Sequence, residues 1–251
     1  MKKIFSIILA GLFITNLCSC SRIVTAVLVS GNRIKAREIR EVRDTVHGKD
    51  IVIIGTHHVG SPRYYSDVRR RLDSLRSAGY VVFFEGVGTP ASMDSLSRDT
   101  LERKMRRVLG AYVGPSYADR SNKSTRRYAK RYVAQTMDIL GLDWDSPDCI
   151  MADLTMSELI RRFEMDKGGI ALTDYDWETP LKSKYKRRKS GDKKYYDRGY
   201  MIHSLREHCV IRQVYASDSS RIVLLYGFTH FYPLQFLIRD RMLEDRVYGP
   251  E

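Results

Sequence analysis

The stretch "IVIIGTHHVG", Ile51–Gly60, is the strongest indication of the fold. Four apolar residues run directly into Gly55, which is typical of a strand that is buried on both faces of a parallel sheet. His57 and His58 follow where that strand should end, and they are two of only six histidines among 251 residues. Core packing does not require adjacent imidazoles there, so the stretch also marks a candidate site.

The remainder of the chain alternates short apolar runs with longer segments of helical spacing. Pro62–Ala78 carries apolar residues at helical intervals, with proline at its start and Gly79 directly after it. We expect three more strands, at Tyr80–Phe84, Cys149–Ala152 and Arg221–Tyr226. The alternation predicts an α/β domain with a mainly parallel central sheet flanked by helices. Its bounds are 51–251, with an irregular and basic insertion at about 164–194.

The N-terminus has the features of an export signal. Residues 1–19 combine two lysines with an apolar stretch that is short for a transmembrane helix. Leu17 and Ser19 before Cys20 look like a bacterial lipobox, in which the cysteine is lipidated. We therefore expect an exported bacterial lipoprotein of the cell envelope, with a membrane-proximal lead-in over residues 20–50.

Composition limits the partners. The formal net charge of +13 favours anionic surfaces, and for a lipoprotein the nearby anion is membrane lipid. No nucleic-acid-binding motif accompanies the charge, so we expect no nucleic-acid partner. Apart from Cys18 and Cys20, only Cys149 and Cys209 remain, and their spacing does not show whether they pair.

Histidines and carboxylates follow all four predicted strands. His57 and His58 follow the first strand, Glu85 the second, Asp153 the third and His230 the fourth. The carboxyl ends of parallel strands share one edge of the sheet, and ligands bind in the crevice outside that edge. Imidazoles and carboxylates gathered there suit either a divalent metal or acid–base chemistry without one.

The first and last of these strand ends share a pattern. "GTHH" and "GFTH" are both Gly-x-x-His directly after an apolar strand. We expect the glycines to permit a sharp turn that presents a side chain over the sheet edge. The threonines are expected to hydrogen-bond an imidazole or the loop backbone.

These motifs resemble those of the TraB/PrgY/GumN/Tiki family, which is related to ChaN-like haem-binding lipoproteins and erythromycin esterases. The resemblance covers Ile51–Glu85, with "IVIIGTHHVGSPRYY", and Arg221–Leu234, with "IVLLYGFTHFYPL". In between, Asp153 and Arg198 stand where the family usually has an Asp and an Arg. "YYDRGYM" matches the family's Glu-Arg-Asn/Asp stretch in part, with Asp197 in place of Glu.

The resemblance implies a divalent-metal-dependent hydrolase that cleaves peptide bonds of a peptide or protein substrate, with Mn, Co, Fe or Zn as the metal. His58 and His230 would be metal ligands or the catalytic pair, and Glu85 a third ligand or the general base. Asp153 would be a ligand or would orient a histidine. Arg198 would stabilise the developing oxyanion.

Two alternatives remain open at this point. A non-catalytic lipoprotein could bind haem, metal or a peptide, with Tyr64, Tyr65 and the histidines as haem ligands. An esterase-type hydrolase could use histidine without a metal. The position of His57 fits either a ligand or the variable residue of the motif.

Overall fold

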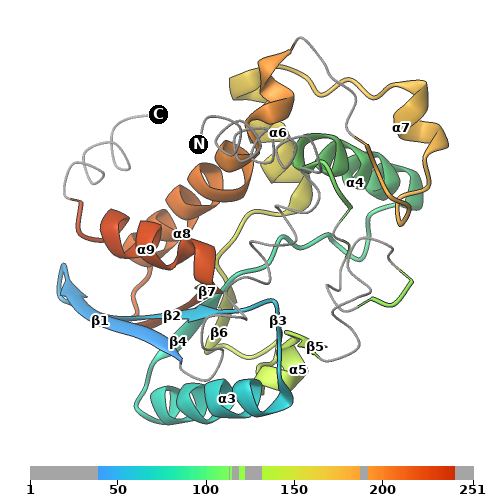
Figure 1. The fold of residues 1–251 in the computed structure, drawn as a ribbon. Coiled ribbons are helices and arrows are strands. Elements are labelled where there is room, and N and C mark those ends of the chain that lie inside the picture. Colours follow the sequence, from blue (N-terminus) through green and yellow to red (C-terminus); the bar gives the residue numbers. More distant parts are fainter. Residues whose placement is uncertain (1–38, 113, 115–118, 122–131, 187–191, 241–251) are drawn as a thin grey trace, which may run out of the picture.

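A five-stranded sheet organises the chain, in the order β1-β2-β7-β4-β6 (Figure 1). The computed structural model describes residues 39–112, 114, 119–121, 132–186 and 192–240. The sheet strands are β1 (Arg40–Val46), β2 (Lys49–Thr56), β4 (Val81–Phe84), β6 (Cys149–Met151) and β7 (Arg221–Gly227). β1 is antiparallel to β2 and the other neighbours are parallel, which confirms the predicted α/β class with a mainly parallel sheet. A separate antiparallel pair joins β3 (Val59–Gly60) to β5 (Val133–Ala134).

Helices fill the connections between the strands. They are α3 (Pro62–Ser77), α4 (Ser95–Leu109), α5 (Met137–Leu140), α6 (Met156–Lys167), α7 (Asp174–Glu178), α8 (Leu205–Ala216) and α9 (Phe228–Leu237). A 3-10 turn, η3 (Lys193–Tyr196), and a π-helical turn, η4 (Tyr200–Ser204), precede α8. Two starts follow from capping, because the Ser61 and Thr155 side chains accept backbone N–H bonds from the first turns of α3 and α6.

The strands pack as their sequences predict. Successive side chains of β2 point to opposite faces, so Val52 and Ile54 enter one apolar cluster while Ile51 and Ile53 enter another. Figure 1 shows α3 on one face of the sheet and α8 with α9 on the other. A third apolar cluster, which includes Phe163, lies among α4, α6 and η4.

The strand register aligns the strand ends. Thr56 of β2 lies opposite Gly227 of β7, and Phe84 of β4 lies opposite both Leu225 of β7 and Met151 of β6. The residues that follow these strands therefore emerge at one edge of the sheet. This is the edge at which the sequence places its histidines and carboxylates.

Several features differ from the sequence-based boundaries. β1 lies in the expected lead-in and pairs along its full length with β2, so the folded domain includes Arg40. The expected insertion contains the end of α6, α7 and η3, while residues 187–191 lie outside the described part of the chain. The signal segment 1–19 and Cys20 also lie outside it. Cys149 and Cys209 are both free thiols.

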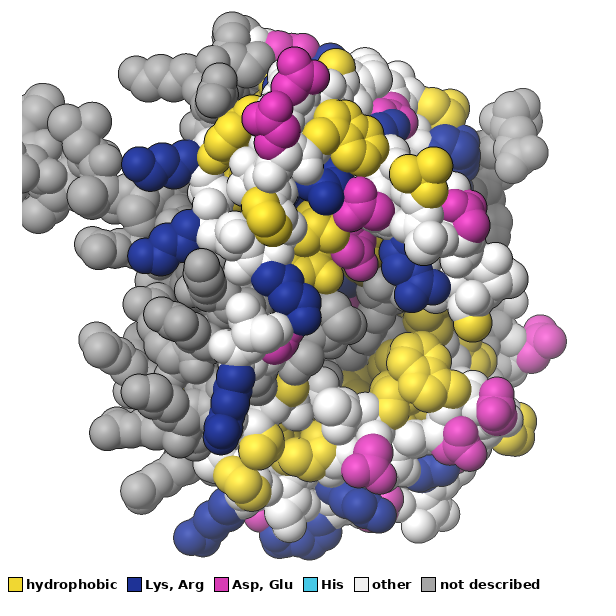
Figure 2. Space-filling view, turned by 90° about the vertical axis from the view of Figure 1, so that its right-hand side faces the viewer, with side chains coloured by type: hydrophobic (Ala, Val, Ile, Leu, Met, Phe, Trp, Pro, Cys, Tyr) yellow, Lys and Arg dark blue, Asp and Glu magenta, His cyan; other side chains and the backbone are white. Residues whose placement is uncertain are grey.

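The surface mixes charges of both signs. On the face shown in Figure 2, Lys and Arg side chains are interspersed with acidic and hydrophobic ones. Several basic residues of the described chain form surface ion pairs, for example Arg71 with Glu41 and Arg162 with Glu158. Within the described ranges, no helix combines the length and the apolar character that crossing a bilayer requires.

Candidate functional site

Side chains from four distant parts of the sequence meet at the carboxyl edge of the sheet. Glu85 directly follows β4, and its carboxylate accepts a hydrogen bond from the backbone N–H of Gly227 at the end of β7. His230 lies in the first turn of α9, and its Nε2 is 3.5 Å from Glu85 Oε1. Asp153 follows β6 and is completely buried. Topology thus places the predicted residues together, as expected.

Arg206 lies at the centre of this group. Its Nη2 donates to Glu85 Oε1 at 2.6 Å and to Asp153 Oδ2 at 2.5 Å, while its Nε is 3.1 Å from both Asp153 oxygens. Asp153 also accepts from the backbone N–H groups of Gly86 and Leu154. A guanidinium held between two buried carboxylates is costly to desolvate, and this makes the array a candidate functional site.

The arginine of the site differs from the one predicted. Arg198 lies ahead of η4, and its buried Nη1 has no hydrogen-bond partner among the described residues. None of the contacts described above involves it. Arg206, in the first turn of α8, is instead the arginine that contacts Glu85 and Asp153.

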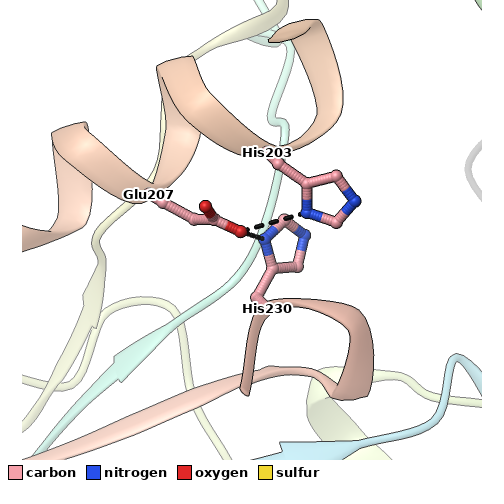
Figure 3. Close-up of side chains that lie close together, drawn as sticks. All are labelled: His203, Glu207 and His230. Carbon is pink, nitrogen blue, oxygen red and sulfur yellow. Dashed lines mark hydrogen bonds and ion pairs between the residues drawn. The ribbon is translucent and has the colours of Figure 1, made fainter. Parts of the chain in front are cut away.

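Two further residues extend the cluster. Glu207 Oε1 lies 2.9 Å from His230 Nδ1 and 3.0 Å from His203 Nδ1 (Figure 3). Burial acts to raise the pKa of Glu207, but hydrogen bonds from the two imidazoles outweigh it, and the pKa is lowered. The carboxylate is therefore ionised and accepts from an Nδ1–H of each histidine.

His58 joins the cluster through Gly227. A Cβ placed on Gly227 would lie 2.8 Å from Glu85 Oε2 and 3.1 Å from His58 Nε2, so the site requires glycine at this position. A Cβ placed on Gly55 would likewise lie 3.0 Å from the ring of Phe231. Neither glycine has a positive φ, so the expected sharp turn is not the reason for glycine at these positions. Glycine is required because neighbouring side chains approach the backbone too closely for a Cβ.

The neighbouring residues of the first motif lie elsewhere. His57 packs beside the rings of Tyr64 and Phe228, with centroid distances of 5.5 and 5.9 Å. Its carbonyl accepts the hydroxyl of Tyr65, and Thr56 donates to the carbonyl of Tyr226. The His57 ring thus packs among aromatic side chains, and Thr56 bonds the backbone.

Burial and neighbouring charges together determine the protonation of the central groups. Burial acts to raise the pKa of Glu85, but attraction to Arg206, His58 and His230 outweighs it and holds this pKa well below its ordinary value. Burial is also the largest influence on His58, and together with Arg206 and His230 it lowers the pKa against the opposing effect of Glu85. At neutral pH the site therefore contains an ionised Glu85 and a neutral His58.

The predicted metal ligands do not fit a metal ion as a set. An ion bound to both Glu85 and Asp153 would lie within roughly 2.0–2.2 Å of an oxygen of each. Arg206 Nη2 already occupies that position between the two carboxylates. A different set, His203, Glu207 and His230, has its donor atoms within 4.8 Å of one another.

The structure gives no support for tyrosine ligation of haem. Tyr64 and Tyr65 are both buried in the core cluster beside α3. The Tyr65 hydroxyl is also engaged by the carbonyl of His57 at 2.5 Å. Neither phenol is accessible to an iron ion at the surface.

The sequence did contain a signal for the residues that were missed. Glu207, Val210, Ile211 and Val214 have core spacing in α8 and all are buried, so a charged residue occupies an apolar helix face. His203 lies four residues before Glu207, where side chains on one helix face meet.

Comparison with known proteins adds no family assignment. No protein-family model, no curated protein and no solved structure matches this chain. The resemblance to the TraB/PrgY/GumN/Tiki family therefore stays a prediction, which is based on the motifs at the ends of β2 and β7.

Proposed function

We propose that the chain is a hydrolase that cleaves an acyl bond, with peptides as the first substrate class to test. The observation that carries this proposal is the buried Glu85–Arg206–Asp153 ion array with His58 and His230 beside it, at the carboxyl edge of the sheet. Buried charges with strongly perturbed pKa values are characteristic of catalytic sites.

His58 is the proposed general base. Its lowered pKa keeps the imidazole neutral, and the residue is partly exposed. A neutral imidazole can take a proton from a water molecule as that water attacks a carbonyl carbon. The ionised Glu85 nearby stabilises the imidazolium that this transfer forms.

Arg206 is the proposed oxyanion stabiliser. Its Nη2 and Nε are engaged by carboxylates, whereas Nη1 makes two long contacts of 3.5 Å within the described residues, to the carbonyl of Ile202 and to His230 Nε2. A fixed guanidinium with a weakly engaged N–H can donate to the negative oxygen of a tetrahedral intermediate. This is the role that the resemblance implied for Arg198.

His230 is the proposed proton donor to the leaving group. Glu207 fixes its ring through Nδ1, so Nε2 faces Arg206 and Glu85. A carboxylate that orients a catalytic imidazole in this way is a recurring arrangement in hydrolases. The proton that His58 takes from water can pass to the amine or alcohol by way of this imidazole.

The N-terminal features complete the proposal. The signal segment and Cys20 support a lipid-anchored protein in a bacterial cell envelope, acting on peptides or proteins there and not on nucleic acid. One lipid chain gives only marginal anchoring, so stable attachment requires more than one.

The test compares wild type with His58→Ala, His230→Ala and Glu85→Gln. Each protein is incubated with a peptide mixture of known sequences and with p-nitrophenyl acyl esters, with and without chelator. Cleavage should fall at least about 100-fold in each variant while far-UV circular dichroism stays native. His208→Ala is the matched control, because this exposed imidazole bonds only a local carbonyl in the described structure. Full activity in His58→Ala would remove the proposed base, and no cleavage by wild type would refute the proposed substrate classes.

A further inference from the structure

We propose that His203, Glu207 and His230 form a binding site for one first-row divalent transition metal, for which Zn²⁺ is the best match. Two imidazole nitrogens and one carboxylate oxygen are ligands that Zn²⁺ accepts readily. The site is separate from the position between Glu85 and Asp153, which Arg206 occupies. The inference deepens the proposed hydrolase and rests on it only for what the metal would do there.

The three donor atoms are almost in place. Glu207 Oε1 is 2.9 Å from His230 Nδ1 and 3.0 Å from His203 Nδ1, and all three atoms lie within 4.8 Å. Ligands at roughly 2.0–2.2 Å from a tetrahedral ion lie about 3.4 Å apart. Small side-chain rotations would therefore convert two hydrogen bonds into three metal bonds, with each imidazole changing tautomer so that its proton lies on Nε2 instead of Nδ1.

Charge favours a cation at this position. The cluster contains the carboxylates of Glu85, Asp153 and Glu207, and the guanidinium of Arg206 is the only arginine or lysine group among its contacts described above. With neutral imidazoles, three negative charges and one positive charge leave two negative charges in a largely buried space. Unbalanced buried charge is unfavourable, and a dication would neutralise it.

Arg206 does not block this site. The guanidinium approaches His230 at Nε2, whereas Glu207 approaches at Nδ1, on the other side of the ring. With a metal on Nδ1, the Nε2–H would face Glu85 Oε1, which is 3.5 Å away. A carboxylate behind the second ring nitrogen is the usual partner of a metal-bound histidine.

The local backbone and exposure suit an entry route. His203 lies in the π-helical turn η4, directly before α8, and such turns occur often at functional sites. Its side chain is 33% exposed, whereas those of Glu207 and His230 are 6% and 2% exposed. An ion can therefore reach the buried pair past His203. Three protein ligands would leave an open position, at which a bound metal would lower the pKa of water or polarise a carbonyl.

The test measures metal binding directly. The full-length chain, purified in detergent without a polyhistidine tag, is titrated with Zn²⁺ in competition with a chromophoric chelator. Wild type should bind one equivalent, and His203→Ala and Glu207→Gln should each weaken binding at least about 100-fold. His208→Ala, on the same helix and exposed, should bind as wild type does. Co²⁺ should give the visible absorption of a low-coordinate site in wild type but not in His203→Ala.

The outcomes separate this inference from the proposed function. Absence of stoichiometric Zn²⁺ binding, or wild-type binding by His203→Ala, would overturn the site. If His58→Ala weakened Zn²⁺ binding and His203→Ala did not, the metal would lie among the residues that the sequence predicted. That result would also overturn the His203–Glu207–His230 site. Hydrolysis that persists without Zn²⁺ binding would refute the metal site alone, whereas Zn²⁺ binding without hydrolysis would refute the hydrolase alone.

Discussion

Replacement of Arg206 by methionine should destabilise the protein strongly and in a pH-dependent way. Methionine retains much of the buried apolar volume but removes the charge that Glu85 and Asp153 share at 2.6 and 2.5 Å. Removal of one partner from a buried ion pair costs about 3–5 kcal/mol. Two carboxylates lose their partner here, so we expect about 5 kcal/mol at pH 7. That is a third or more of the 5–15 kcal/mol by which a domain is typically stable.

The pH dependence follows from Glu85. In wild type its pKa lies well below the ordinary value, so its contribution to stability is present above that ordinary value and is lost as pH falls through the folded-state pKa. In Arg206→Met, burial still raises the pKa of Glu85, while His58, His230 and the backbone N–H of Gly227 still lower it. Burial is the largest of these effects, so we expect the pKa to rise. The carboxyl then takes up a proton as pH falls. At pH values below the raised pKa of Glu85, the loss of stability of Arg206→Met relative to wild type should shrink by about 1.4 kcal/mol for each pH unit.

The assay is urea unfolding followed by far-UV circular dichroism at pH 7 and pH 5. Arg162→Met is the matched control, because Arg162 and Glu158 form a pair on α6 with side chains 32% and 36% exposed. Such a pair contributes about 0.3–0.5 kcal/mol. A loss below about 1 kcal/mol in Arg206→Met, or the same loss at both pH values, would refute the buried ion array.

Three further predictions concern activity and location. The general base must be neutral, and burial lowers the pKa of His58 from its ordinary value of 6.5. As pH falls, kcat/KM should therefore reach half of its maximum only below pH 6.5, and a midpoint above pH 6.5 would contradict this. Gly227→Ala should reduce hydrolysis roughly tenfold or more by displacing Glu85 and His58, whereas Gly199→Ala, with open space around its Cα, should not. Cys20→Ser should move the protein from the membrane to the soluble fraction, and unaltered fractionation would count against lipidation.

The sequence predicted the part of the site that topology determines. Apolar runs that end in histidine or carboxylate identified His58, Glu85, Asp153 and His230, because the ends of parallel strands must share an edge. No knowledge of side-chain packing was needed for that step. The sequence does not indicate a strand at β1, because its exposed and half-buried residues resemble those of a mixed-charge linker.

The helical part of the site was harder to predict. Arg206, Glu207 and His203 lie on a helix, and charged helical residues are usually solvated. Whether a given helix face is buried depends on its packing against α9 and the sheet, which the local sequence does not specify. Arg198 and Arg206 are eight residues apart, about two helical turns, and only tertiary packing determines which of them reaches Glu85.

The most direct test of the central claim is a histidine titration by NMR in wild type and Glu85→Gln. The claim is that His58 and His230, although far apart in sequence, share one charged site with Glu85. Loss of the Glu85 charge should lower the pKa of His58 further and shift the imidazole signals of His58 and His230, while the signal of His208 stays in place. Unchanged signals from His58 and His230 in Glu85→Gln would contradict the account.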